Sequence, residues 1–315
     1  MTAPPTVSIV MPCFNARPHL PASVGSVLAQ SSADWEIIAV DDGSQDGTLE
    51  WLQAQADPRI RWITQTNQGV SAARNAGIAV ARGQFLAFLD ADDTWSPEFL
   101  QQMLQGLAER PDAVLAYCGW QNIGLAGGKG EPYVPPDHET TDKQRRLFAA
   151  CLWPIHGAMV RRKAVVNAGG FNPALKNAED YALWLTVAAH APIVRVPAVL
   201  AFYHFHGGAQ ASAHKARAAL HFLEAQIAYL ATHPEFARAL ERGTARTLTL
   251  GTLLRRGYDC YWSNELAESR VIFRAVMKHG YGTRGDWLYM LPALLPLRWH
   301  RRVIDMLRSR RNNGT

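Results

Sequence analysis

Cysteine is scarce and widely spaced in this sequence of 315 residues. The chain has four cysteines and no CxxC pair. Their positions are Cys13, Cys118, Cys151 and Cys260. A structural zinc site and a disulfide framework both need closer, more regular spacing, so the sequence argues against both. We expect buried thiols instead.

A membrane-spanning run is also missing. One apolar, tryptophan-bearing stretch, WLYMLPALLPLRW at residues 287–299, contains two prolines. It is shorter than the about 20 apolar residues that a spanning helix needs. The first residues have neither a basic segment nor a long apolar segment before a small-residue cleavage site. No secretory signal is therefore predicted, and we expect a cytoplasmic protein.

Positive charge is concentrated after that apolar stretch, although the net charge is only +5. The last eighteen residues hold six arginines, at positions 298, 301, 302, 308, 310 and 311. Two interpretations stay open. The segment is either a packed C-terminal helix with a solvated basic tail, or an interfacial segment that rests on anionic lipid at the inner face of the membrane.

Low-complexity segments, repeats of solenoid length and nucleotide-fingerprint loops are absent. The glycine-rich string GLAGGKGEP at residues 124–132 has neither a P-loop pattern nor a strand-turn-helix setting, so we interpret it as a loop. Nothing indicates binding of nucleic acid, flavin or nicotinamide. The hydrophobic fraction of 48% and the charged fraction of 19% are those of a folded protein.

Short apolar runs alternate with helical patterns through the first two thirds of the chain. The runs end at polar turns, and the helical patterns carry apolar residues at three-to-four spacing. Strands are predicted at 7–11, 36–40, 60–64, 84–89, 113–118 and 155–161, and helices at 20–30, 70–82 and 178–190. This order predicts an α/β fold with a Rossmann-like, mostly parallel, doubly wound sheet.

The pattern becomes mostly helical beyond about residue 212. Apolar residues recur at three-to-four spacing in 217–231, 235–256 and 264–278. We therefore predict an α/β domain over residues 1–212 and a C-terminal helical extension over residues 213–315. The extension could contact a membrane surface or form an oligomer contact.

Three polar turns follow predicted strands directly. Residues 12–15, 41–44 and 90–93 each lie just past the carboxyl end of a strand. In an open α/β sheet, ligands bind outside those ends, near the point where the strand order reverses. The three turns are therefore expected to meet in one crevice.

The turn at 90–93 presents three carboxylates, Asp90, Asp92 and Asp93, within the string AFLDADDTW. In an extended chain, Asp90 and Asp92 point to one side and Asp93 points to the other. Two converging carboxylates suit Mg²⁺ or Mn²⁺, which completes its shell with water and phosphate oxygens. The cluster therefore predicts a divalent-metal site that receives a diphosphate leaving group.

Three other interpretations of this cluster exist. An EF-hand loop starting at Asp90 needs glycine at position six and glutamate at position twelve, where the chain has Trp95 and Gln101. A helix cap accounts for Ser96 but not for Asp90. The string LDADDT also matches the D-x-D-x-T signature of haloacid dehalogenase-like, magnesium-dependent phosphohydrolases, with Asp90 as nucleophile and Asp92 as acid-base partner. Against it, the motif follows two full strand-helix units, and no later strand ends in paired acids.

Six strings carry a family resemblance. They are VSIVMPCFN, EIIAVDDGSQDGT, NQGVSAARNAG, RGQFLAFLDADD, GGFNPALKNAEDYALW and YHFHGGAQAS. Each is weak alone, but in this order, over residues 6–212, they resemble the family 2 glycosyltransferases with the GT-A fold. The resemblance implies an inverting transferase that moves a sugar from a nucleotide-diphosphate sugar, with a UDP-sugar favoured. The implied acceptor is a glycan or lipid-linked glycan of bacterial surface polysaccharide synthesis.

The resemblance also implies a metal site. Asp92 would be the more direct ligand of Mn²⁺ or Mg²⁺, and Asp90 would share the metal and the donor diphosphate. The histidine of the last string, His206, resembles one that lies near the metal or diphosphate. Many members have arginine where this chain has His204, so two imidazoles compete for that place.

The catalytic base implied by the resemblance is Asp180, with Glu179 beside it. Phe14 would stack on the nucleoside, and Asp42 would accept a hydrogen bond from its base or ribose. The donor-binding residues carried over in this way are Pro12, Phe14, Asn15, Asp42, Asn67, Arg74, Asp90 and Ala91. A binding protein that kept the fold without the chemistry is the remaining class, and the presence of all these acids argues against it.

Overall fold

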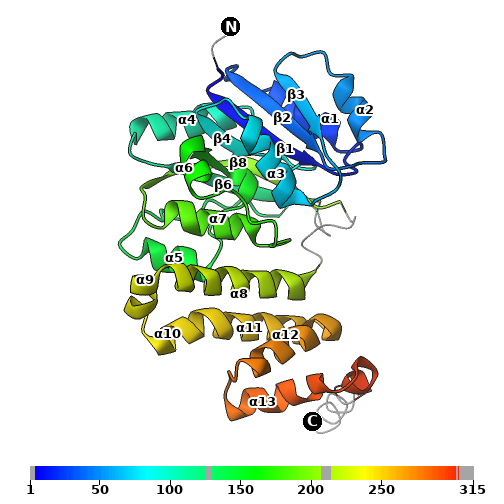
Figure 1. Cartoon of the computed structure of the whole chain (residues 1–315), viewed down its shortest axis with the longest axis vertical. Helices are drawn as coiled ribbons and strands as arrows, with labels where there is room; N and C mark the ends of the chain where they lie inside the picture. Colours follow the sequence, from blue (N-terminus) through cyan, green and yellow to red (C-terminus); the bar gives the residue numbers. More distant parts are fainter. Residues whose placement is uncertain (1–3, 125–129, 207–213, 303, 305–315) are drawn as a thin grey trace. The chain divides into compact units, whose positions relative to one another are not determined.

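The computed structural model describes residues 4–124, 130–206, 214–302 and 304. The chain divides into two compact units, Met1–Gly208 and Ala209–Thr315 (Figure 1). The predicted boundary near residue 212 lies outside the described residues.

The first unit is built on an eight-stranded sheet with the order β3-β2-β1-β4-β7-β6-β8-β5. Its strands are β1 (Val7–Cys13), β2 (Trp35–Asp41), β3 (Ile60–Thr64), β4 (Phe85–Phe88), β5 (Thr94–Trp95), β6 (Leu115–Ile123), β7 (Ala158–Arg161) and β8 (Ile193–His204). The first four strands pair in parallel, whereas β7 is antiparallel to β4 and β6, and β5 is antiparallel to β8. The α/β fold is confirmed, and its second half is mixed rather than parallel throughout.

Burial on both faces explains the continuous apolar runs of the parallel strands. Every residue of β2 is buried, and in β1 only Pro12 is partly exposed. Proline is disfavoured in a central strand because it cannot donate a ladder hydrogen bond. The register between β1 and β4 ends at Val10 and Phe88, so Pro12 removes no bond from that pair.

Helices connect these strands. They are α1 (Leu20–Leu28), α2 (Thr48–Gln53), α3 (Val70–Val80), α4 (Phe99–Glu109), α5 (Lys143–Ala149), α6 (Arg162–Asn167) and α7 (Glu179–Ala188), with a short 3₁₀ turn, η1 (Ile155–Gly157). Helix α3 packs very closely on β1, since a Cβ atom at Gly77 would lie 2.5 Å from the Val10 side chain. This close approach places the polar face of α3 near the carboxyl end of the sheet.

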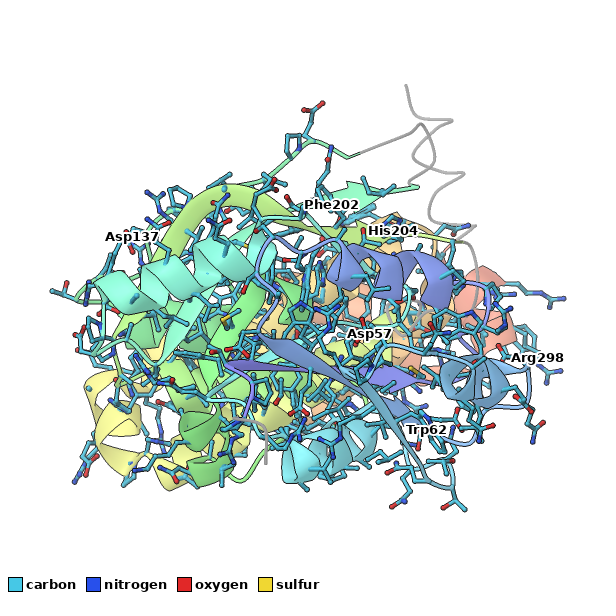
Figure 2. The ribbon with its side chains drawn as sticks, turned by 90° about the horizontal axis from the view of Figure 1, so that it is seen from above. Asp57, Trp62, Asp137, Phe202, His204 and Arg298 are labelled. Carbon is cyan, nitrogen blue, oxygen red and sulfur yellow. The ribbon has the colours of Figure 1, made fainter. Side chains whose placement is uncertain are left out.

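Strand β8 was not predicted, and its proline explains why. Pro197 interrupts the apolar run IVRVPAVLAFYH, which disfavours a strand assignment. In the structure, the β6–β8 register skips from Val196 to Val199, so the proline falls in an irregularity of the ladder. The end of β8 carries Phe202 and His204 (Figure 2), and Phe202 pairs with Thr94 directly after the acidic turn.

The second unit is helical, as predicted for this part of the chain. Its elements are α8 (Lys215–Thr232), α9 (Pro234–Ala239), α10 (Arg242–Arg246), the π-helix η3 (Thr247–Gly251), α11 (Thr252–Trp262), α12 (Leu266–Lys278), α13 (Arg284–Met290) and the 3₁₀ segment η4 (Leu291–Leu294). The segment 235–256 is helical in separate pieces, because Glu241 takes a φ of +54° between α9 and α10. None of the helices that the structure describes combines the length and apolarity that crossing a bilayer requires.

Candidate functional site

The first two polar turns meet at the carboxyl edge of the sheet. The Asn15 backbone N–H donates to Ser44 Oγ over 2.9 Å, and the Gln45 N–H donates to Asn15 Oδ1 over 2.9 Å. The Asp42 N–H also donates to the Cys13 carbonyl. The turns that follow β1 and β2 therefore form one hydrogen-bonded edge, as their position after adjacent strands predicts.

Phe14 is presented outward from this edge. Its side chain is 54% exposed, although large apolar side chains are usually buried. The next residue, Asn15, has a φ of +50°, a left-handed conformation that asparagine tolerates better than most residues. Stacking of Phe14 on a nucleoside stays a prediction, and the exposed ring is compatible with it.

Asp42 has a different environment from the one predicted. Its side chain is only 3% exposed and accepts three hydrogen bonds, from Gln65 Nε2, the Gln68 N–H and the Gly69 N–H. A carboxylate has about four acceptor positions, so little capacity remains for a ligand. The structure gives Asp42 the role of holding the 65–69 turn, and its contact with a nucleoside stays a prediction.

Asn67 lies exposed in that turn, close to the glycine that follows Asp42. Gly43 has a φ of +77°, and a Cβ atom there would lie 3.1 Å from the Asn67 backbone nitrogen. Only glycine combines this conformation with so close a backbone approach. The turn after β2 and the turn after β3 are thus fixed against each other.

The acidic cluster is a β-turn rather than an extended chain. The Asp93 N–H donates to the Asp90 carbonyl over 3.0 Å, which closes the turn. Ser23 of α1 donates its hydroxyl to the carbonyls of Asp93 and Asp90. The premise of period-two alternation was therefore wrong, although Asp93 does point into the interior. Ala91 is buried at the centre of the turn.

The Asp93 side chain is buried and does not face the site. It is 0% exposed, whereas the side chains of Asp90 and Asp92 are each 29% exposed. Burial, with the charges of Asp90 and Asp92, raises the pKa of Asp93 well above its usual range. Its Oδ2 lies 3.2 Å from His156 Nδ1, and burial lowers the pKa of that imidazole to about 4. Both shifts favour the neutral forms of the two side chains.

Asp92 is paired with an imidazole. His206 Nε2 lies 2.9 Å from Asp92 Oδ2, and the centre of the His19 ring lies 4.4 Å from that of the His206 ring, with the two planes tilted by 32°. His204 Nε2 instead lies 2.9 Å from Thr94 Oγ1, and burial lowers its pKa. Of the two competing imidazoles, His206 is the one beside Asp92, the carboxylate predicted to bind the metal.

Arg74 joins the two acidic clusters, which are about ninety positions apart in the sequence. Its Nη2 lies 2.7 Å from Asp90 Oδ1 and its Nη1 lies 2.8 Å from Glu179 Oε1. The guanidinium is 2% exposed and sits 5.2 Å from the centre of the Phe171 ring. Arg74 is thus a buried clamp that holds the Asp90 turn against the start of α7, and its contact with the donor stays a prediction.

Replacing Arg74 by methionine is expected to destabilise the first unit. The change leaves Asp90 and Glu179 without their buried cation, which typically costs about 3 kcal/mol or more. Urea unfolding followed by circular dichroism measures the loss. Arg110→Gln removes an exposed ion pair with Asp112 and should leave the transition unchanged. Equal stability of the Arg74→Met variant and the wild type would contradict the clamp.

Asp180 lies beside this clamp, in the first turn of α7. Its Oδ1 accepts a hydrogen bond from the Tyr181 N–H over 2.7 Å, and Cys151 Sγ lies 3.9 Å from its Oδ2. Burial, with the adjacent charge of Glu179, raises the pKa of Asp180 to about 7. A carboxyl group that titrates near neutral pH can exchange a proton with a substrate, so Asp180 is suited to acid-base work.

The backbone just before Asp180 is strained. Ala178 has a φ of +59°, a left-handed conformation that costs a residue with a Cβ atom about 1–2 kcal/mol. Such strain persists only where the surrounding structure enforces it, and it clusters at functional sites. Here it turns the chain so that Glu179 reaches Arg74.

The donor set suits a hard divalent cation that shares its shell with a ligand. Asp92 and His206 supply adjacent oxygen and nitrogen donors. Among the described residues, no group of three His, Cys, Asp or Glu side chains could hold a metal ion by itself. Mg²⁺ and Mn²⁺ are often held by one or two side chains, with phosphate oxygens and water completing the shell. The residues present therefore fit a metal that binds together with a diphosphate.

Sequence reasoning missed two neighbours of this site. His19, just before α1, makes a tilted ring contact with His206, and Ser23 holds the backbone of the acidic turn. Neither residue belongs to a recognisable spacing pattern. The only available signal was their place on the helix that follows the first strand, and this signal does not separate them from other polar residues there.

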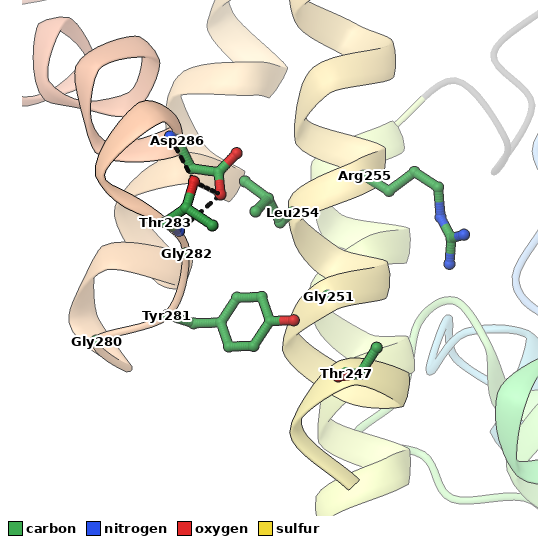
Figure 3. A pocket seen from close by; sticks show the side chains of 9 residues that line it. All are labelled: Thr247, Gly251, Leu254, Arg255, Gly280, Tyr281, Gly282, Thr283 and Asp286. Carbon is green, nitrogen blue, oxygen red and sulfur yellow. Dashed lines mark hydrogen bonds between the residues drawn. The ribbon is translucent and has the colours of Figure 1, made fainter. Parts of the chain in front are cut away.

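A pocket of about 600 Å³ lies elsewhere, in the helical unit (Figure 3). It is lined by residues of η3 and α11 and by the 280–286 segment. Its main polar groups are already engaged, because Thr283 and Asp286 form a capping box and Tyr258 donates to Asp286. None of the predicted site residues lines it, so we assign it no part in the chemistry.

Comparison with known proteins gives a consistent family. The sequence model described as glycosyl transferase family 2 matches residues 8–169. An Escherichia coli protein, UDP-Glc:alpha-D-GlcNAc-diphosphoundecaprenol beta-1,3-glucosyltransferase WfgD, is 32% identical over 183 residues, which is 58% of this chain and 69% of that protein.

Solved structures share the fold. The S. aureus TarS 1-349 structure in complex with UDP-GlcNAc superposes with a TM-score of 0.58 at 17% identity, covering 80% of each chain. The mannosyltransferase PcManGT from Pyrobaculum calidifontis, in complex with GDP-Man and Mn²⁺, superposes with a TM-score of 0.59 at 18% identity, covering 95% of this chain and 87% of that one. At such identities the likeness concerns the fold alone.

Proposed function

Because this chain belongs to glycosyl transferase family 2, and is therefore a glycosyltransferase, we propose that it inverts configuration as it moves a sugar from a nucleoside-diphosphate sugar to an acceptor hydroxyl. The observation that carries this proposal is the Arg74 clamp. It brings the turn with Asp90 and Asp92 and the helix start with Glu179 and Asp180 to one edge of the sheet.

Asp180 acts as the general base in this proposal. In its carboxylate form it takes the proton of the acceptor hydroxyl while that oxygen forms a bond to the anomeric carbon. The bond from the anomeric carbon to the diphosphate oxygen breaks, and its electron pair leaves with the nucleoside diphosphate. One displacement of this kind inverts the anomeric centre without a covalent enzyme intermediate.

Asp92 and His206 would hold the divalent ion, with Asp90 fixed beside them by Arg74. Mn²⁺ or Mg²⁺, when bound, supplies positive charge that stabilises the leaving diphosphate. Phe14 offers a flat apolar face for the nucleoside base. Asp42 and Asn67 act indirectly, since they shape the turn that borders this face.

The donor favoured by this proposal is a UDP-sugar, and the acceptor is a glycan or lipid-linked glycan of surface polysaccharide synthesis. The name of the relative WfgD, which includes a UDP-sugar and a diphosphoundecaprenol acceptor, supports this choice. The UDP-GlcNAc bound in the TarS structure carries the nucleotide that we favour for the donor, whereas the GDP-Man bound in PcManGT carries another. The identity of the donor nucleotide therefore needs a direct test.

Incubation with UDP-, GDP- and dTDP-sugars and Mn²⁺ tests the function. We expect slow release of UDP from a UDP-sugar, and no release of phosphate from a small phosphomonoester. Phosphate release that Asp90→Asn abolishes would instead support the phosphohydrolase alternative. Asp90 is poorly placed for that role, because its Oδ1 is held by the buried Arg74 guanidinium, which lowers its nucleophilicity.

The rate of transfer is expected to fall as the pH drops through about 7. Asp180 works as a base only when deprotonated, and its pKa is about 7. One pH unit below that value kcat/KM should be about tenfold under its plateau, since kcat/KM follows the titration of the free enzyme. In Glu179→Gln this acidic limb of the pH profile, the range in which kcat/KM falls, should move to lower pH, because the Glu179 charge helps to raise the pKa of Asp180.

Glu109→Gln is the matched control for this profile, since Glu109 is exposed at the end of α4. Its limb should coincide with that of the wild type. A flat profile between pH 5 and pH 8, or a limb that Glu179→Gln leaves in place, would remove Asp180 from the role of base.

A further inference from the structure

An exposed apolar surface lies on the helical unit, remote in sequence from the catalytic residues. It is formed by α13, η4 and the turn of helix that follows at 297–302 (Figure 1). Leu288 is 72% exposed and Leu294 is 52% exposed. The 288–299 surface, as we name it, consists of Leu288, Tyr289, Leu291, Leu294, Leu295 and Trp299, each at least 40% exposed.

This surface is additional to the core of the unit. Met290, Ala293 and Ile304, from the same segment, are almost fully buried against the apolar cluster of α11 and α12. A helical segment that packs on a core normally turns a polar face outward. Here the outward face is apolar as well, and Trp262 of α11 extends it through a ring contact with Tyr289 at 6.0 Å. Several large apolar side chains exposed together in one segment are typical of an interaction site.

Cations border the surface on its C-terminal side. Arg298, Arg301 and Arg302 are exposed, and the guanidinium of Arg302 lies 5.0 Å from the centre of the Trp299 ring. No acidic residue occurs between Asp286 and position 302, and Asp286 is engaged in the capping box of α13. The partner must therefore offer apolar bulk next to negative charge.

A second copy of this chain does not meet that requirement. In a symmetric dimer both copies contribute the same patch, and residues 287–302 carry three exposed arginines and no acidic residue that could pair with them. A spanning helix does not meet it either, because the run is short and contains two prolines. An anionic lipid surface does, since leucines and tryptophan enter the acyl boundary while arginines contact the headgroup charges.

We infer that the 288–299 surface, with Arg298, Arg301 and Arg302, is a docking surface for an anionic lipid membrane. The inference does not rest on the proposed catalytic chemistry, and its test requires none. Vesicle sedimentation of the full chain, without donor or metal, compares phosphatidylcholine alone with phosphatidylcholine containing phosphatidylglycerol. We expect sedimentation with the anionic vesicles, weaker at high salt, and little with the neutral ones.

Two variants separate the apolar from the charged contribution. Leu291→Ser with Leu295→Ser, and Arg298→Gln with Arg301→Gln and Arg302→Gln, should each weaken binding to anionic vesicles by about tenfold or more. Matched controls are Val166→Ser with Ile227→Ser, two other exposed apolar positions, and Arg238→Gln with Arg242→Gln and Lys278→Gln. These controls should bind as the wild type does.

Three results would overturn the inference. The wild type could stay in the supernatant with both kinds of vesicle. The controls could lose as much binding as the surface variants. Sedimentation velocity could show a dimer that the double serine variant dissociates while vesicles bind neither protein, which would assign the surface to a second copy.

Discussion

Replacing Asp180 by asparagine is expected to abolish sugar transfer and to leave donor affinity almost unchanged. Asparagine has the same shape and keeps an oxygen for the Tyr181 N–H, so the start of α7 should stay intact. The amide cannot accept the proton of an acceptor hydroxyl. Loss of a general base typically lowers the rate by about 10² to 10⁴.

Two measurements make this prediction sharp. Steady-state transfer gives kcat, and calorimetric titration with UDP in the presence of Mn²⁺ gives donor-site affinity. Asp112→Asn, at an exposed carboxylate outside the site, should change neither quantity. Transfer within a few-fold of the wild-type rate would remove Asp180 from the mechanism. A parallel loss of UDP affinity would make it a binding residue.

Replacing Asp92 by asparagine is expected to remove the contribution of the metal to nucleotide binding. Asp92 is partly exposed and lies beside His206, so it is the carboxylate best placed to ligate the ion. An amide is a much weaker ligand for a hard cation than a carboxylate. We expect UDP affinity in Mn²⁺ to fall at least about tenfold, towards the value that the wild type shows without metal.

Asp93→Asn is a stringent control, because it makes the same change one residue further along. Burial already raises the pKa of Asp93 well above its usual range, which favours the neutral form that asparagine resembles. The His204 N–H would still have an oxygen to bond. Mn²⁺-dependent UDP affinity should therefore stay near the wild-type value. Equal losses in the two variants would indicate damage to the turn rather than removal of a ligand.

Strands β1, β2 and β4 could be predicted from sequence because they are buried on both faces and therefore form short apolar runs. The edge strand β3 is only partly buried, yet it and the start of α3 also fall at the predicted residues. Strand β8 could not be predicted in the same way. Its proline is accommodated by an irregularity in the pairing with β6, and that pairing is a tertiary feature.

The candidate site shows the same division. The three turns after β1, β2 and β4 could be placed together from the rule that ligands bind at the carboxyl ends of strands. The internal partners of their side chains could not. The Asp42 carboxylate accepts hydrogen bonds from the 65–69 turn, and the Arg74 guanidinium forms ion pairs with Asp90 and Glu179. Which carboxylate is satisfied within the protein depends on packing between distant segments, and spacing carries no information about it.

Titration of UDP into the wild-type protein, with Mn²⁺ and with a chelator, tests the central claim most directly. If Asp92 and His206 hold a divalent ion for the donor diphosphate, Mn²⁺ should tighten UDP binding at least about tenfold. Equal affinity in Mn²⁺ and in chelator would contradict it.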